Sequence, residues 1–170
     1  MSGPVAVLVG PPGSGKTTVG GVLAQRLGVS LHDTDAAVES AAGRSISDIF
    51  VQDGEAAFRA LEREAVLRAL REERGVVALG GGAVMQEAVA DALREGSTPV
   101  VFLDVTIADA ARRVGFDASR PLLVVNPRAS WNRLMAARRP TYESLATIHV
   151  ATGGLTPEEV ATEVEAGLGR

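Results

Sequence analysis

The residues best suited to chemistry stand near the start of the chain, in the run Gly10-Pro11-Pro12-Gly13-Ser14-Gly15-Lys16-Thr17. This run fits the pattern G-x-x-x-x-G-K-[ST], in which backbone amides surround a phosphate chain and the lysine reaches its outer phosphates. An apolar segment precedes the run and a helical pattern begins inside it, as a phosphate-binding loop requires. The sequence therefore predicts a nucleoside triphosphate site formed by Gly13, Ser14, Gly15, Lys16, Thr17 and Thr18, with the Thr17 hydroxyl placed to bind Mg²⁺.

Of the 17 basic residues, only Lys16 is a lysine. A compact ammonium fits between phosphates in a way that a planar guanidinium does not, so this bias supports the same site. It also argues against a GTPase, because the Asn-Lys-x-Asp segment of that class cannot exist in a chain whose only lysine is Lys16. A large motor or transporter ATPase would need more than 170 residues. A small kinase is the class that remains.

An acceptor site is expected beyond the carboxyl ends of the other strands, where α/β sheets bind their ligands. Asp33 and Asp35 follow an apolar segment with one residue between them, so one could face a metal and the other a substrate hydroxyl. Asp also caps helix N-termini, and that structural explanation stays open. The run Gly80-Gly81-Gly82 follows another apolar segment and indicates close approach of some group to the main chain, although a tight turn would also use glycine.

Several arginines could serve such a site, but their spacing does not rank them. Arg59 and Glu62 share a helix face, which on periodicity alone favours a solvated ion pair. Arg120 lies in a segment flanked by glycine and proline, which is expected to be a loop able to close over a transferring phosphate. Arg138 stands at an expected helix break before Pro140.

Asp104 ends an apolar run, as does Asp33, and the pattern alone does not decide which of the two is the better candidate near Mg²⁺. The two histidines, Trp131 and Tyr142 are interpreted as structural, because a lone histidine beside a strand is more often packed than catalytic.

Apolar runs alternate with helical patterns along the whole chain, which is typical of βαβ units. Strands are expected at 5–9, 29–32, 76–79, 100–104 and 147–151. Residues 36–74 are expected to form helices in three pieces broken at Gly43 and Gly54, and further helices are expected to end near Leu27 and Leu93, to cover 107–114 and 130–139, and to start at Thr156. Residues 115–127 are expected to form a loop. The prediction is one domain over 1–170, a three-layer α/β/α fold around a mostly five-stranded parallel sheet.

The composition limits the other possibilities. Hydrophobic residues make up 46% of the chain, enough for a substantial core. The net charge of −4 argues against a nucleic acid or an anionic membrane as the main partner. The chain has no cysteine, and its start lacks the features of a signal peptide. The cytoplasm is therefore expected, and a monomer is expected because no long exposed apolar helix demands a partner.

Taken together, these motifs resemble the shikimate kinase family over nearly the whole chain. The resemblance rests on the phosphate loop, on Asp33 and Asp35, and on several short segments that follow one another in the family's order. These further segments are Gly43-Arg44-Ser45-Ile46, Ile49-Phe50, Gly54-Glu55, Phe58-Arg59, Glu62, Gly80-Gly81-Gly82, Arg120-Pro121-Leu122-Leu123 and the motif Arg138-x-Pro140-x-Tyr142. It implies a P-loop fold like that of nucleoside monophosphate kinases, with a lid at about 115–127, and MgATP-dependent phosphorylation of the 3-hydroxyl of shikimate.

The resemblance also implies roles for single residues. Lys16 would bind the phosphates, and Thr17 would bind the metal with Asp33 in its outer shell, which demotes Asp104. Asp35 would contact the reacting hydroxyl. Arg59 and Arg138 would bind the shikimate carboxylate, with Glu62 and residues 80–82 nearby. Residues at about 35–62 would form a substrate-binding helical segment. Arg120 would close with the lid, and Arg113 and Pro157 would lie at the adenine.

The chain departs from the family pattern at three places. Leu155 stands where some relatives carry an arginine near the adenine, Arg139 adjoins the expected substrate residue Arg138, and Phe116 is bulky for the lid. Two alternatives are kept: a kinase for another small acceptor, such as gluconate or a nucleoside monophosphate, and a nucleotide-dependent binding module without turnover.

Overall fold

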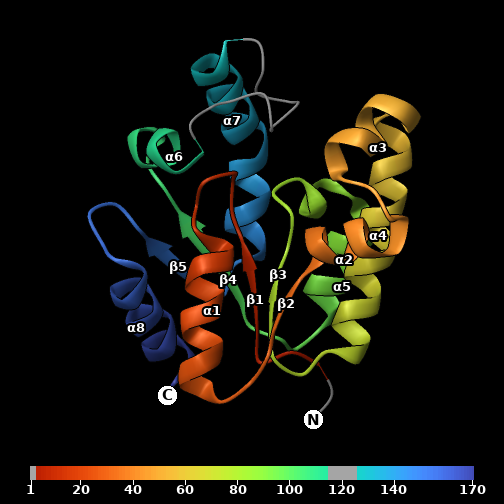
Figure 1. The fold of residues 1–170 in the computed structure, drawn as a ribbon. Helices are drawn as coiled ribbons and strands as arrows, with labels where there is room; N and C mark the ends of the chain where they lie inside the picture. Colours follow the sequence, from red (N-terminus) through yellow and green to blue (C-terminus); the bar gives the residue numbers. More distant parts are fainter. Residues whose placement is uncertain (1–2, 115–125) are drawn as a thin grey trace.

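The computed structural model describes residues 3–114 and 126–170, and a five-stranded parallel sheet forms its centre (Figure 1). Its strand order is β2-β3-β1-β4-β5. The strands are β1 (Ala6–Val9), β2 (Leu31–Asp33), β3 (Val76–Ala78), β4 (Val100–Asp104) and β5 (Ile148–Ala151). Because β1 lies between β3 and β4, the order reverses beside it, and the loop after β1 lies where ligands bind in such sheets.

Nine helical elements connect or follow these strands within the described residues. They are α1 (Lys16–Leu27), α2 (Thr34–Ala42), α3 (Ile46–Asp53), α4 (Glu55–Glu72), the 3-10 helix η1 (Ala83–Met85), α5 (Glu87–Glu95), α6 (Ile107–Val114), α7 (Pro127–Leu145) and α8 (Pro157–Leu168). In the ranges that the structure covers, no helix combines the length and apolarity needed to cross a membrane.

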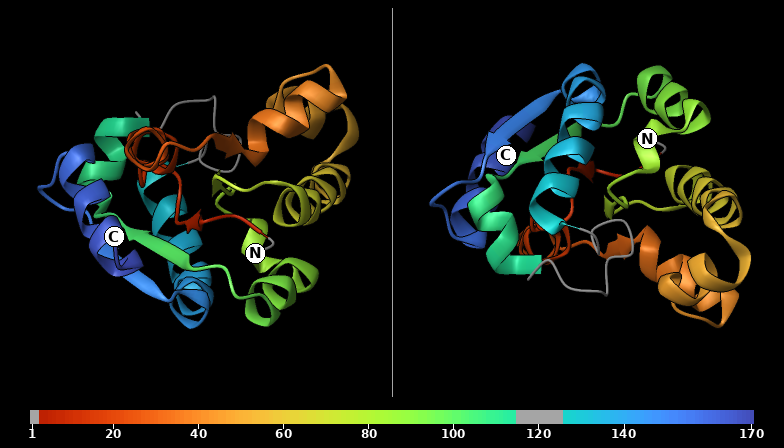
Figure 2. Two further views of the ribbon diagram at one scale, coloured as in Figure 1. Left: turned by 90° about the horizontal axis from the view of Figure 1, so that it is seen from below. Right: turned by 90° about the horizontal axis from the view of Figure 1, so that it is seen from above.

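Two hydrophobic cores lie on the two faces of the sheet, which makes the fold three-layered as predicted (Figure 2). One core joins alternate residues of the sheet to α4, α5 and α7, and includes Phe102, Trp131 and Tyr142. The other joins the opposite residues to α1 and α8, and includes Leu8 and Leu23. Strands with both faces covered explain why these segments are apolar without alternation.

A third, smaller core belongs to the helices that follow β2. Val38 of α2, Ile49 of α3 and Phe58 of α4 form its buried centre. The chain breaks between these helices at Gly43, which adopts a left-handed φ of 68°, and at Gly54, with φ of 91°. Both breaks were predicted. The three helices form a separate lobe beside the sheet (Figure 1).

Two boundaries differ from the prediction for clear reasons. Strand β2 begins at Leu31 rather than Val29, because the Val29 amide donates to Ala24 O at 2.9 Å in the C-terminal cap of α1. Helix α7 begins at Pro127, within the segment expected to be a loop, because Asn126 caps it and proline suits the first helical position. The rest of the expected lid, 115–125, lies outside the described residues.

The expected helix break at Pro140 is wrong. Helix α7 runs from Pro127 to Leu145 with Pro140 inside it. Proline removes one backbone hydrogen bond there, but anchored side chains stand on both sides of it. Arg139 bonds to Asp104, and Tyr142 bonds to Gly81. These tertiary contacts hold the helix together across the proline.

Candidate functional site

The loop after β1 has the shape of a phosphate cradle. Gly10, Gly13 and Gly15 have φ values of 155°, 82° and 88°, which glycine adopts readily. Lys16 Nζ donates to the carbonyl oxygens of Gly10, at 2.8 Å, and Pro11, at 3.1 Å. The lysine is thereby held over the loop, and helix α1 starts at the same residue with its N-terminal amides toward the loop.

Asp33 both caps a helix and contacts the phosphate loop. Its Oδ1 accepts from the amides of Asp35, at 2.9 Å, and Ala36, at 3.2 Å, and so caps α2. Its Oδ2 accepts from the Thr17 hydroxyl at 2.7 Å. A hydroxyl and a carboxylate oxygen side by side next to the cradle are ligands that suit Mg²⁺, whose remaining positions are usually filled by phosphate and water. The pair fits the predicted metal position.

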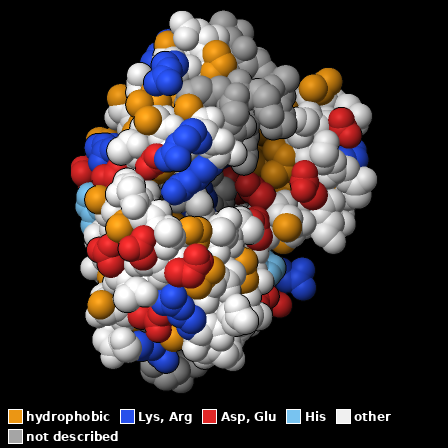
Figure 3. Space-filling view, turned by 60° about the vertical axis from the view of Figure 1, so that its left-hand side comes forward, with side chains coloured by type: hydrophobic (Ala, Val, Ile, Leu, Met, Phe, Trp, Pro, Cys, Tyr) orange, Lys and Arg blue, Asp and Glu red, His pale blue; other side chains and the backbone are white. Residues whose placement is uncertain are grey.

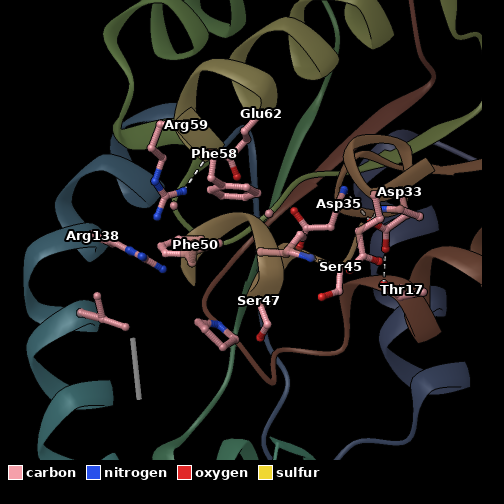
Figure 4. A pocket seen from close by; sticks show the side chains of 18 residues that line it. Thr17, Asp33, Asp35, Ser45, Ser47, Phe50, Phe58, Arg59, Glu62 and Arg138 are labelled. Atoms are coloured by element: carbon pink, nitrogen blue, oxygen red, sulfur yellow. Dashed lines mark hydrogen bonds and ion pairs between the residues drawn. The ribbon is translucent and has the colours of Figure 1, made fainter. Parts of the chain in front are cut away.

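A cavity of about 620 Å³ opens between this loop, the lobe of α2 to α4, and α7. Figure 4 shows its opposite ends: Arg59 and Arg138 lie at one end, while Asp35, Asp33 and Thr17 lie at the other. In the space-filling view of Figure 3, acidic side chains follow the hollow between the main body and the helical lobe. The cavity is therefore polarised, with a cationic end and an acidic end that adjoins the phosphate loop.

The cationic end is built from α4 and α7. Arg59 Nη1 donates to Glu62 Oε1 at 2.8 Å, and Gln86 donates to the same oxygen at 3.1 Å. Glu62 is only 1% exposed, so the prediction of a solvated ion pair, made from periodicity alone, is wrong. The lobe and η1 bury this carboxylate. Arg138 is 6% exposed and is aimed into the cavity from α7.

The three glycines 80–82 each leave room for a different charged side chain. A Cβ on Gly80 would lie 2.6 Å from Asp35 Oδ1 and 2.7 Å from Glu62 Oε2, and one on Gly81 would lie 3.0 Å from Arg138 Nη1. A Cβ on Gly82 would lie 2.7 Å from Arg59 Nη1. The run is thus more than a turn: its main chain lines the cavity, and only glycine leaves enough space there for the neighbouring charged side chains.

A second, smaller cavity of about 250 Å³ continues from the phosphate loop past Ser14 and Thr18 to Arg113, Pro157 and Val160. Arg113 Nη1 donates to Gly13 O at 3.2 Å, which places its guanidinium against the loop. Leu155 packs on the core of α1 and α8. The structure therefore brings together Arg113 and Pro157, the two residues expected at the adenine.

Arg139, which adjoins Arg138, has a different partner. Its guanidinium donates to both carboxylate oxygens of Asp104, at 2.8 and 2.9 Å, and His149 Nε2 lies 2.9 Å from Asp104 Oδ2. The hydrogen bond from Arg139 is the main reason that the pKa of Asp104 is lowered. Arg138 is therefore the arginine of this pair that lines the cavity, whereas Arg139 pairs with Asp104. The Asp104 carboxylate is occupied by Arg139 and His149.

Some residues of the site were missed or undervalued from the sequence. Trp131 Nε1 donates to Pro12 O at 3.1 Å, and the Tyr142 hydroxyl donates to Gly81 O at 2.5 Å, so both are structural but touch the site's loops. Leu134, one helical turn before Arg138, lines the cavity with Ser45, Ser47 and Phe50. Spacing of four residues from Arg138 could have indicated Leu134. Arg120 lies outside the described residues.

A parallel sheet with a glycine-rich loop and a lysine at the start of a helix, beside a polarised acceptor cavity, defines a small P-loop kinase. The family model for shikimate kinase matches residues 12–168. Two relatives named shikimate kinase, from Salinispora arenicola and Thermobifida fusca, are 59% and 58% identical, covering 97% and 94% of this chain and 98% and 92% of theirs.

Solved structures agree. A shikimate kinase from Acinetobacter baumannii in complex with shikimate superposes with a TM-score of 0.93 at 32% identity, covering 99% of this chain and 94% of that one. A gluconokinase from Sinorhizobium meliloti, at 20% identity and a TM-score of 0.60, shares the fold alone; it covers 98% of this chain and 92% of that one. The chain belongs to the shikimate kinase family. It is an ATP-dependent kinase that phosphorylates shikimate.

Proposed function

We propose that shikimate occupies the large cavity with its carboxylate against Arg59 and Arg138 and its 3-hydroxyl toward Asp35. The observation that carries this proposal is the separation of charge between the two ends of the cavity (Figure 4). Planar guanidinium groups suit a carboxylate, because each can offer two parallel donors. The opposite orientation would place the carboxylate of the substrate beside Asp35 and Asp33, where like charges repel.

Asp35 orients the attacking hydroxyl and accepts its proton as the phosphoryl group moves. Asp35 stands in the first turn of α2, which is capped by Asp33. Phosphoryl transfer passes through a loose transition state, so accurate placement matters more than a strong base. The loss of Asp35 is therefore expected to reduce turnover through misplacement as well as through the lost proton acceptor.

On the nucleotide side, Lys16 and the amides of residues 13–18 bind the phosphates, and the adenine lies by Arg113 and Pro157. Thr17 and Asp33 would hold Mg²⁺, directly and through water, and the bound ion would neutralise charge on the β- and γ-phosphates. Arg120, with the rest of a lid at about 115–127, would close over the transferring phosphate. The helical segment 35–62 would bind the acceptor.

The proposal extends to a single-domain monomer in the cytoplasm, with a small molecule rather than a nucleic acid or a membrane as its partner. The absence of cysteine supports the cytoplasm, and the net charge of −4 argues against a nucleic acid or an anionic membrane as the partner.

The test is ADP release in a coupled assay with MgATP and shikimate, gluconate or AMP at equal concentration. We expect rapid turnover with shikimate alone, abolished by Lys16→Ala and reduced on the order of 10²-fold or more by Asp35→Asn. An Asp35→Asn enzyme with unchanged kcat would refute the role of Asp35. Equal turnover with gluconate would refute the expected selectivity for shikimate.

A further inference from the structure

Helix α7 touches both halves of the site. Near its start, Trp131 donates to Pro12 of the phosphate loop, and near its end Tyr142 donates to Gly81 of the glycine run. Between them, Arg138 reaches the cavity. One rigid helix therefore fixes two loops that meet the two substrates.

The Tyr142 side chain lies behind the cavity wall. It is 0% exposed, and its ring packs against Phe102 with centroids 5.1 Å apart. It cannot touch a ligand itself, and its hydroxyl is directed to the Gly81 carbonyl at 2.5 Å. Any effect of this hydroxyl on the substrate must pass through its neighbours, the Gly81 carbonyl and the guanidinium of Arg138.

The position of Gly81 matters to the groups around it. A Cβ at Gly81 would lie 3.0 Å from Arg138 Nη1, 3.3 Å from Pro12 Cδ and 3.4 Å from Gly10 O. The main chain at Gly81 therefore packs directly against the guanidinium of Arg138 and the phosphate loop. The peptide that follows is trans, so fixing its carbonyl toward Tyr142 also fixes its Gly82 amide in the opposite direction.

We infer that Tyr142 is a positioning residue for the acceptor's carboxylate: its hydroxyl holds the Gly81–Gly82 peptide, lies against the guanidinium of Arg138, and so fixes the place of Arg138. The inference rests on the proposed function, in which Arg138 and Arg59 bind that carboxylate. It assigns to the tyrosine of the Arg138-x-Pro140-x-Tyr142 motif a role in acceptor binding rather than in packing alone.

The state of the hydroxyl agrees with this role. Burial raises the pKa of Tyr142 to about 12, against an opposing effect of the positive charge of Arg138. The hydroxyl therefore stays protonated, and remains a donor to Gly81, throughout the neutral pH range.

The test compares Tyr142→Phe with the unaltered enzyme on two acceptors, shikimate and its uncharged carboxamide. The variant keeps the ring and loses only the hydroxyl. We expect the KM for shikimate to rise about tenfold, the equivalent of one lost hydrogen bond, with kcat and the KM for MgATP within about twofold. With the carboxamide, the two enzymes should differ by less than about twofold, because the carboxylate contact is already missing.

Two further variants separate the possible failures. Ser144→Ala removes an exposed hydroxyl that donates to Thr141 O on the same helix, and it should leave both acceptors unaffected. Arg138→Met should lose affinity for shikimate but not for the carboxamide. If Arg138→Met behaves in this way and Tyr142→Phe weakens both acceptors equally or neither, the inference is overturned while the proposed function stands. If Arg138→Met weakens both acceptors equally, the carboxylate placement itself is wrong.

A measurement without a variant guards against a misfolded Tyr142→Phe protein. Tyr142 is the only tyrosine of the chain, so fluorotyrosine labelling gives a single ¹⁹F signal. We expect saturating shikimate to shift this signal and the carboxamide at equal saturation to leave it in place. An unshifted signal with shikimate would also overturn the inference.

Discussion

At the scale of single residues, Gly80 and Gly82 lie against different charged side chains of the same cavity. Gly80 adjoins Asp35 and Glu62, whereas Gly82 adjoins Arg59, and a Cβ at either would approach these side chains within 3.0 Å. Such a distance forces the neighbouring charged group to move. Substitutions at these two positions of one run should therefore have different kinetic effects.

We predict that Gly80→Ala lowers kcat, by about 10²-fold, because it displaces Asp35 from the attacking hydroxyl, and also raises the KM for shikimate, because it displaces Glu62, the partner of Arg59. Gly82→Ala should mainly raise the KM for shikimate, by about tenfold, because it displaces Arg59. Steady-state kinetics with varied shikimate separates the two effects. Identical kinetic defects in both variants would contradict the prediction.

Gly21 provides the matched control. It lies inside α1, and a Cβ there would meet nothing within 4 Å. Gly21→Ala should leave the kinetics unchanged and stabilise the protein by about 0.5–1 kcal/mol, since glycine is unfavourable in a helix interior. Denaturant unfolding measures this gain.

The carboxylate of Asp104 gives a prediction about pH. The bond from Arg139 lowers its pKa in the folded state below the unfolded value of about 4. The carboxylate therefore stabilises the fold above the unfolded pKa, and this contribution is lost as the pH falls through the lowered folded pKa. Asp104→Asn should cost about 1–3 kcal/mol at neutral pH and progressively less below about pH 4.

Denaturant unfolding at several pH values checks this dependence. Glu143→Gln is the comparison, because Glu143 is half-exposed and lies 3.7 Å from the same guanidinium; its effect should be small. A cost of Asp104→Asn that stays constant down to the acid limit would contradict the assignment of the pair.

The sequence was most informative about residues whose role depends on local geometry. Lys16 and Thr17 could be placed because a phosphate loop is one continuous segment. Tyr142 could not, because its partner Gly81 is far away in the sequence and the bond depends on how α7 packs on the sheet. The burial of Glu62 could not be predicted for the same reason, because Gln86, at the end of η1 and distant in the sequence, contacts it.

At the scale of elements, α7 carries the contact between the protein core and the phosphate loop. Trp131 is the chain's only tryptophan, and its indole donates to Pro12 O at 3.1 Å. Nucleotide bound in the loop should change the surroundings of this indole. We predict that MgATP alters the intrinsic tryptophan fluorescence in a saturable way.

Lys16→Ala should lose this response at the same nucleotide concentration, because its phosphate contact is gone. Arg94→Ala should keep it, because Arg94 is an exposed residue of α5 that pairs with Asp91 of the same helix. A fluorescence spectrum that saturating MgATP leaves unchanged would show that the loop and α7 are not linked as proposed.

Element boundaries were predictable where a single residue sets them. The breaks at Gly43 and Gly54 follow from glycine conformation, and the start of α8 follows from Thr156 and Glu159, which form a capping box. The continuity of α7 through Pro140 was not predictable, because local preference argues for a break and only the distant partners Asp104 and Gly81 overcome it.

At the scale of the whole molecule, the helical lobe has a core of its own. Val38, Ile49 and Phe58 form this small cluster, separate from the two large cores that flank the sheet. A small core stabilises its helices less, so the lobe should open locally more often than the sheet. The cavity lies between the lobe and the rest of the protein, and an acceptor that touches both would hold them together.

We therefore predict that amides of α2 and α3 exchange with deuterium faster than those of α1 and β1. Shikimate should slow exchange in α2 and α3, because the acceptor binds the folded lobe and not its locally opened state. Mass spectrometry of peptides from these segments measures both effects. Exchange in α3 as slow as in α1, before any ligand is added, would contradict the view of the lobe as a separate unit.

The single lysine has a further consequence. Besides the α-amino group of the first residue, Lys16 is the chain's only primary amine, and it rests on the carbonyls of Gly10 and Pro11. Any acylating agent directed at lysine side chains, whether a laboratory reagent or a cellular acetyl donor, therefore has one side-chain target, and that target lies in the nucleotide site. Acetylation of the single lysine would therefore inactivate the enzyme, and bound ATP would protect the lysine from acetylation.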